Sequence, residues 1–203
     1  RLVVELARAG SEGQAAWQQA RPANDWNGFK PFLERIIALK LEQADCLGYS
    51  DEPYDALLDR YEVGETVRSI EPILSGLREP LVSLLHRICD RSPAEEPLLS
   101  QARFPTEAQH AFAQHVLKQI GYDFDAGRLD TTAHPFTVGI GPGDVRITTR
   151  YDEVQVARGF FGAMHEAGHA LYDAGLPKEH WGTPLGDSVS LGIHESQSRL
   201  WEN

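Results

Sequence analysis

Apolar residues recur every three or four positions through the first 120 residues, a spacing typical of amphipathic helices. On this basis we predict helices over Leu2–Ala20, Phe32–Leu47, Pro53–Arg60, Glu65–Asp90 and Thr106–Ile120. Packing of these helices against one another explains nearly all of their apolar positions. The first part of the chain is therefore predicted to be helical.

Prolines, a threonine and a glycine mark where these helices bend, begin or stop. Pro72 and Pro80 predict kinks or a break in the long helix, because proline lacks the N–H that closes a helical hydrogen bond. Thr106 is a candidate N-cap, and Gly121 is a stop signal after the last helix of this part. We interpret Arg91–Pro97 as a linker.

The pattern changes at Gly121, where alternating and β-branched residues replace the helical period. Thr131–Ile140 and Asp144–Tyr151 are predicted strands, and Gly141–Gly143 between them is a turn signal. The sequence therefore predicts a β-hairpin. Its edge would offer an extended peptide a strand to lie along.

Two further helices are predicted after the hairpin, over Val154–Ala174 and Ser188–Asn203. A loop rich in glycine and proline, Gly175–Gly186, joins them and would let them pack antiparallel. The first is apolar on most sides, which is typical of a buried helix. The predicted fold class is thus mainly α, with a small β-hairpin or sheet beside these two helices.

An H-E-x-x-H motif lies in the first of these helices, with His165 and His169 one turn apart. Residues at i and i+4 share a helix face, so both imidazoles can bind one metal ion. Glu166 lies between them and can reach an attacking water without being a ligand. The alternative is that both histidines face solvent. This interpretation is weaker, because the positions around them on the helix are apolar.

A catalytic metal site needs a third protein ligand. Glu195 in the second helix is the best candidate, and His194 beside it is a rival that spacing alone does not exclude. Asp173, four residues after His169, could accept the second ring proton of that histidine or be a plain surface acid.

Four blocks resemble the carboxypeptidase Taq family of metallocarboxypeptidases: His134–Phe136, Asp144–Thr148, His165–His169 and His194–Ser198. The resemblance implies a helical zincin-like metallopeptidase fold. The change of pattern at Gly121 divides the chain into a helical region over 1–120 and a region of hairpin and metal helices over 121–203. Both regions would belong to one continuous catalytic domain.

By the same resemblance His165, His169 and Glu195 are the metal ligands, and Glu166 is the general base. Zinc is the expected metal, although a His/His/Glu set also accepts cobalt. The expected reaction is hydrolysis of the C-terminal peptide bond of a substrate with a free C-terminus. An oligopeptide metallo-endopeptidase, or a catalytically silent helical fragment with a structural or empty metal site, are the alternatives.

Members of that family are longer than this chain and carry two further blocks downstream, of the types IRxxAD and GxxQDxHW. Neither block is present, the chain starts at Arg1, and it stops at Asn203 within a predicted helix. We therefore expect a fragment truncated at both ends, with little activity alone, that associates through its exposed apolar face. For the full-length enzyme we expect a homodimer.

Three residues are candidates for substrate binding. Arg146 could bind the C-terminal carboxylate, because arginine binds carboxylates through two hydrogen bonds. A structural ion pair with Asp144 on the same strand face is an equal alternative. His134 could line the substrate pocket or be a structural histidine, and His194 could contact the reacting carbonyl or orient Glu195.

Composition excludes some classes of function. A net charge of −11 argues against nucleic-acid binding, which needs basic patches. No apolar run reaches the length of a membrane span. Cys46 and Cys89 match no metal or redox spacing, so we expect reduced core thiols and a cytoplasmic location.

Overall fold

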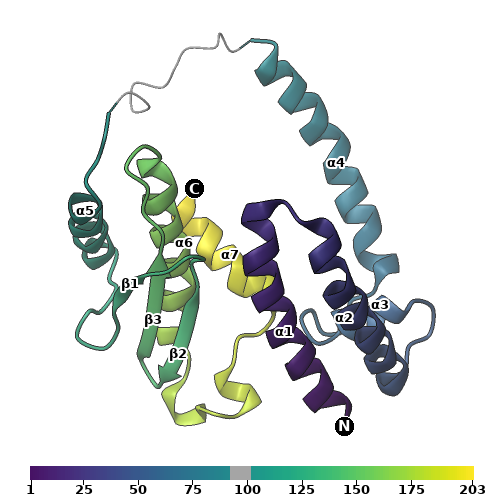
Figure 1. Ribbon diagram of the computed structural model, residues 1–203. Coiled ribbons are helices and arrows are strands. Elements are labelled where there is room, and N and C mark those ends of the chain that lie inside the picture. Colours follow the sequence, from purple (N-terminus) through teal and green to yellow (C-terminus); the bar gives the residue numbers. More distant parts are fainter. Residues whose placement is uncertain (92–101) are drawn as a thin grey trace. The chain divides into compact units, whose positions relative to one another are not determined.

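The structure, a computed structural model, describes residues 1–91 and 102–203 (Figure 1). The chain forms two compact units, Arg1–Leu85 and His86–Asn203. The predicted linker Arg91–Pro97 lies, beyond its first residue, outside the described residues.

Helices alone build the first unit: α1 (Leu2–Ala23), α2 (Trp26–Leu47), α3 (Pro53–Leu58) and most of α4 (Val67–Cys89). α1 and α2 form a helical hairpin, and they pack closely at Gly13, where an added Cβ would lie 2.8 Å from Cδ1 of Ile36. Asp25 caps α2 by accepting a hydrogen bond from the backbone N–H of Gly28 at 2.9 Å. The predicted helices of this unit are thus confirmed, except that α2 begins at Trp26 and not at Phe32.

Three details differ from the sequence prediction. Pro72 and Pro80 lie inside α4 without breaking it. Pro105 occupies the N-cap of α5 (Thr106–Gln119), so Thr106 is its first helical residue and not its cap. Cys46 and Cys89 are free, but they are exposed instead of buried in a core. Each lies near the C-terminal end of its helix, α2 or α4.

The second unit contains a three-stranded sheet of order β1-β3-β2 (Figure 1). β2 (Thr137–Gly141) and β3 (Asp144–Thr149) form the predicted hairpin, with Thr137 opposite Ile147. The first predicted strand, Thr131–Ile140, is shorter than expected, because the chain is irregular between Thr131 and Thr137. β1 (Leu129–Thr131) pairs parallel to β3, with Leu129 opposite Ile147. Since β1 has only three residues, it gives no detectable alternation in the sequence.

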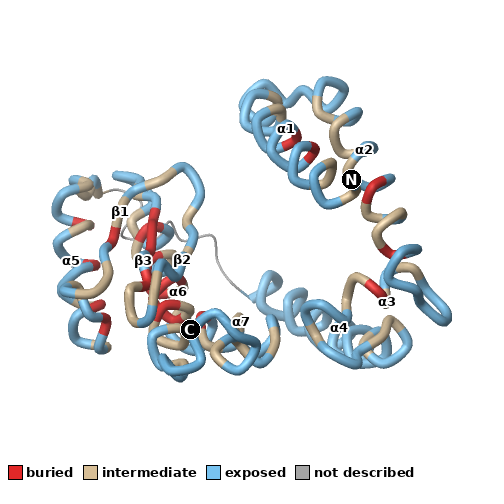
Figure 2. The backbone as a smooth tube through the Cα atoms, turned by 90° about the horizontal axis from the view of Figure 1, so that it is seen from below, coloured by how far each residue is buried: buried red, intermediate tan, exposed pale blue. Residues whose placement is uncertain are grey.

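α6 (Val156–Ala174) packs on β2 and β3, and α5 packs on α6. Buried residues concentrate along β3 and α6 (Figure 2). They form one hydrophobic core: Ala113, Leu117, Tyr122, Leu129, Val145, Ile147, Ala163, Met164, Ala167 and Ala170. α5 therefore belongs with the sheet, so the change of sequence character at Gly121 does not mark a packing boundary. Among the described residues, no helix is long and apolar enough to cross a membrane.

Tyr122 ties this core to the backbone of the sheet. Its hydroxyl lies 2.7 Å from the carbonyl oxygen of Val145 and 3.1 Å from that of Arg128. Burial raises the pKa of Tyr122 to about 12, so the hydroxyl keeps its proton for these carbonyls.

Replacing Tyr122 with phenylalanine should lower the free energy of unfolding by about 1 to 3 kcal/mol, because a buried carbonyl loses its donor. Urea unfolding followed by circular dichroism measures this loss. The matched control is Tyr54→Phe, whose side chain is exposed and which should change stability little. Equal stability of both variants would contradict the role given to the Tyr122 hydroxyl.

Candidate metal centre

α6 presents its small residues to the sheet and its histidines to the other side. Ala163, Ala167 and Ala170 are at most 1% exposed. Because alanine is small, the helix can lie close against β3. His165 and His169 remain partly accessible, with side chains 21% and 12% exposed. The H-E-x-x-H motif therefore faces a place that a ligand can reach.

The second helix of the site, α7 (Leu191–Glu202), begins at Ser190, whose hydroxyl accepts a hydrogen bond from Ile193 N–H at 3.2 Å. α7 crosses α6 at Gly168. A Cβ on Gly168 would lie 2.5 Å from the carbonyl oxygen of Gln197 and 2.6 Å from Cα of Ser198. Only glycine allows this approach, which brings α7 within reach of both histidines.

Glu195 of α7 reaches both imidazoles. One carboxylate oxygen lies 3.7 Å from Nε2 of His165, and the other lies 3.3 Å from Nε2 of His169. The three ligand atoms all lie within 4.8 Å of one another. Ligands about 2.1 Å from a tetrahedral zinc ion would be about 3.4 Å apart. The donor types and their spacing therefore fit a divalent metal.

The environment of His169 favours the form that binds metals. Burial, and after it the neighbouring His194 and His165, lower the pKa of His169. A lowered pKa keeps the imidazole neutral, with a lone pair available for a cation.

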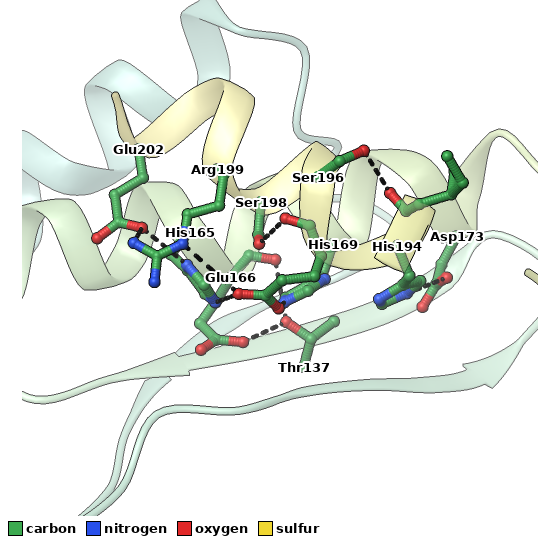
Figure 3. A network of polar contacts seen from close by, with 12 residues as sticks. Thr137, His165, Glu166, His169, Asp173, His194, Ser196, Ser198, Arg199 and Glu202 are labelled. Atoms are coloured by element: carbon green, nitrogen blue, oxygen red, sulfur yellow. Dashed lines mark hydrogen bonds and ion pairs between the residues drawn. The ribbon is translucent and has the colours of Figure 1, made fainter. Parts of the chain in front are cut away.

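Glu166 is 7% exposed and lies against β2 (Figure 3). Thr137 places its hydroxyl 2.6 Å from Oε2 of Glu166 and 2.9 Å from the Glu166 carbonyl oxygen. Burial raises the pKa of Glu166, and the hydrogen bond from Thr137 opposes that rise. A carboxylate with a raised pKa and a fixed orientation is suited to accept and return a proton.

Asp173 contacts His194, which is neither of the two alternatives that the sequence left open for this residue. Its Oδ1 lies 2.8 Å from Nε2 of His194, and no hydrogen bond to His169 accompanies it in the described part of the chain (Figure 3). The ring of His194 stacks on that of His169, with centroids 4.4 Å apart and planes 17° apart. His194 thus occupies the position between Asp173 and His169. Because its Nε2 is engaged by Asp173, His194 does not join the group that converges with Glu195.

The two substrate-binding candidates of the hairpin region are not brought into the converging group. Arg146 is exposed and donates two hydrogen bonds to Asp144, Nε to Oδ1 at 3.0 Å and Nη2 to Oδ2 at 2.9 Å. This is the structural ion pair that the sequence allowed, and it lowers the pKa of Asp144. His134 is exposed, and its carbonyl oxygen accepts a hydrogen bond from the Thr132 hydroxyl at 2.8 Å.

Sequence reasoning missed three residues that contact the site: Thr137, Arg199 and Glu202. Glu202 lies 3.0 Å from Nδ1 of His165, and Arg199 lies 2.8 Å from the same oxygen of Glu202. A signal for Glu202 existed, because residues seven apart share a helix face and Glu202 is seven after Glu195. For Thr137 the sequence held none, since its contact with Glu166 depends on how α6 packs on β2.

Replacing Thr137 with valine should lower kcat about tenfold, because a hydrogen bond to a charged group contributes about 1.5 kcal/mol or more. Metal content should not change, since Thr137 contacts no ligand. Steady-state kinetics and metal analysis of the variant in the complete protein check both expectations. Thr131→Val, at an exposed position of β1, is the control. Equal kcat in both variants would show that the hydroxyl does not serve Glu166.

The chain matches known proteins over its whole length. The model of the family described as carboxypeptidase Taq (M32) metallopeptidase matches residues 1–203. Thermostable carboxypeptidase 1 of Thermus thermophilus is 53% identical over 100% of this chain, and Carboxypeptidase 1 of Bacillus subtilis is 39% identical over 95% of it. The chain spans 42% and 38% of the lengths of these two relatives.

Solved structures agree with this result. A carboxypeptidase of Pyrococcus furiosus has a TM-score of 0.87 at 40% identity, covering 100% of this chain and 41% of that one. An M32 carboxypeptidase of Deinococcus radiodurans has a TM-score of 0.87 at 39% identity, covering 100% of this chain and 40% of that one. The predicted mainly helical, zincin-like fold class is confirmed. The chain belongs to the carboxypeptidase Taq (M32) family of metallopeptidases.

Proposed function

We propose that His165, His169 and Glu195 bind one divalent metal ion, with zinc as the native metal and cobalt as a substitute, and that Glu166 is the general base of a carboxypeptidase. The observation that carries this proposal is the convergence of the three ligand atoms within 4.8 Å of one another. The buried carboxylate of Glu166, on the same helix as two of them, completes the set.

A divalent ion bound here would polarise the scissile carbonyl and lower the pKa of a water molecule. Glu166 takes a proton from the attacking water and then passes it to the nitrogen of the leaving amino acid. Thr137 holds the carboxylate of Glu166 in place between these two transfers. The products are a peptide shortened by one residue and a free amino acid, so a water molecule is consumed in each cycle.

A peptide can lie along β2, which is at one end of the sheet order β1-β3-β2. A cavity of about 200 Å³ opens beside this strand, between the hairpin and the loop after α6. Gly139, Asp173, Lys178 and Trp181 are among its lining residues. An edge strand can provide backbone hydrogen bonds to a peptide, and an adjoining cavity can accept a side chain. This arrangement supports a peptide as the substrate.

The substrate roles of three residues stay part of the proposal. His194 orients the ring of His169, a proposed metal ligand, by stacking on it. Arg146 uses two of its five N–H donors on Asp144, so its remaining donors on Nη1 and Nη2 can bind a substrate carboxylate. His134 is placed to contact substrate from its exposed position. We also infer one catalytic domain that unites 1–120 and 121–203, a homodimer, and a cytoplasmic location in keeping with the free thiols.

The substrate class can be tested with paired peptides. A blocked dipeptide with a free C-terminal carboxylate should be hydrolysed by the complete metal-loaded protein, and the same dipeptide with a C-terminal amide should not. Hydrolysis of both at similar kcat/KM would contradict the carboxypeptidase assignment and favour an endopeptidase, which needs no C-terminal carboxylate. If the metal-loaded protein hydrolysed neither dipeptide, the carboxypeptidase and the endopeptidase assignments would both be contradicted.

A further inference from the structure

The carboxylate of Glu202 contacts His165 at Nδ1, while the other ring nitrogen, Nε2, faces Glu195. Oε2 of Glu202 lies 3.0 Å from Nδ1 of His165 (Figure 3). Nε2 of the same ring lies 3.7 Å from Oε1 of Glu195. Glu195 and Glu202 are seven residues apart on α7, so both face α6. One imidazole is thus held between two carboxylates of a single helix.

This contact decides which nitrogen of His165 carries the proton. A neutral imidazole has one N–H and one lone pair, and a carboxylate only accepts hydrogen bonds. With Glu202 at Nδ1, the hydrogen lies on Nδ1 and the lone pair of Nε2 points to the side where Glu195 and His169 converge. A hydrogen bond from the second nitrogen also makes the first a stronger ligand.

Arg199 holds the carboxylate of Glu202 from the other side. Its Nη1 lies 2.8 Å from Oε2 of Glu202, and its Nε lies 3.7 Å from Oε1 of Glu195. The side chain of Glu202 is only 25% exposed, so water competes weakly for its hydrogen bonds. Two contacts on one oxygen therefore fix the position of the group that faces His165.

We propose that Glu202 is a positioning residue of the metal centre, which fixes the Nδ1–H tautomer and the ring orientation of His165. The proposal rests on the metal site described above and adds a residue to it. Glu202 does not contact the metal or the substrate, and it acts through His165 alone.

Zinc affinity tests this role without an assay of activity. In the complete protein we expect Glu202→Leu to raise the dissociation constant for zinc about ten- to a hundredfold. Glu202→Gln keeps the side-chain length and an oxygen that can accept the Nδ1 hydrogen. This variant should therefore lose less zinc affinity than Glu202→Leu. Glu107→Gln, at an exposed position of α5, is the control and should bind zinc as the parent does. Competition with a chromogenic chelator gives the constants, and circular dichroism checks that each variant is folded.

The tautomer itself gives a second readout. In metal-free protein with labelled histidine, at a pH where imidazole is neutral, the ¹⁵N shifts of His165 should show Nδ1–H in the parent and a mixture in folded Glu202→Leu. Parent-like zinc affinity in that variant, or an Nε2–H tautomer in the parent, would overturn the proposal. A parent protein that binds no zinc would overturn the metal centre itself, and the role of Glu202 with it.

Discussion

Replacing Glu166 with glutamine should lower kcat by about 10²- to 10⁴-fold and leave the amount of bound metal unchanged. Glutamine has the same shape as glutamate, but it cannot take a proton from water. Since Glu166 is buried beside the three converging residues and is not one of them, its loss should not weaken metal binding. Single-turnover kinetics and metal analysis of the complete protein measure the two effects separately.

Glu179→Gln is the matched control, because Glu179 is exposed in the short 3₁₀ helix η2 (Lys178–His180). It should retain the kcat of the parent protein. If Glu166→Gln lost its metal, Glu166 would be a ligand or a structural residue. If it kept near-normal kcat, Glu166 would not be the base, whatever the metal content.

Replacing Gly168 with alanine should damage both the fold and the metal site. The added Cβ would lie 2.5 Å from a carbonyl oxygen and 2.6 Å from a Cα of α7, and backbone cannot turn aside as a flexible side chain can. Overpacking of this kind costs about 1 to 3 kcal/mol or more. Because Glu195 lies on the helix that must move, the distance from its carboxylate to the histidines should grow and zinc should bind more weakly.

A second glycine of α6 provides the control for this substitution. At Gly162 an added Cβ would lie 3.5 Å from Oγ1 of Thr149, which is an ordinary contact. Gly162→Ala should therefore keep zinc affinity and gain stability, because alanine favours a helix by about 1 kcal/mol over glycine. Thermal unfolding and zinc titration of both variants compare the two positions. Equal behaviour would show that the crossing at Gly168 does not set the geometry of the site.

Local pattern was enough to predict most elements. The helical period located α1, α4, α5 and α6 within a few residues, but it placed the start of α2 at Phe32 instead of Trp26. A Gly-Pro-Gly turn located the hairpin. Parallel pairing of β1 with β3 could not be predicted, because it joins three residues to a strand far along the chain. The packing of α5 on α6 could not be predicted either, because the apolar face of an amphipathic helix does not specify which surface it covers.

The site shows the same division. An i, i+4 pair is a local feature, so the sequence alone identified His165 and His169 as candidate ligands. A sequence block pointed to Glu195 as the third. The hydrogen-bond partner of Asp173 could not be predicted, because His194 lies on a different helix. Neither could the close approach at Gly168, where the sequence shows a glycine but not the backbone that it meets.

Anomalous scattering from a crystal of the zinc-loaded protein, measured above and below the zinc absorption edge, tests the central claim most directly. We predict one strong peak about 2.0–2.2 Å from Nε2 of His165, Nε2 of His169 and the carboxylate of Glu195. A peak bound to His194 with Glu195 turned away would contradict the ligand assignment. The absence of any peak at these histidines, in protein that binds zinc elsewhere, would contradict the metal centre.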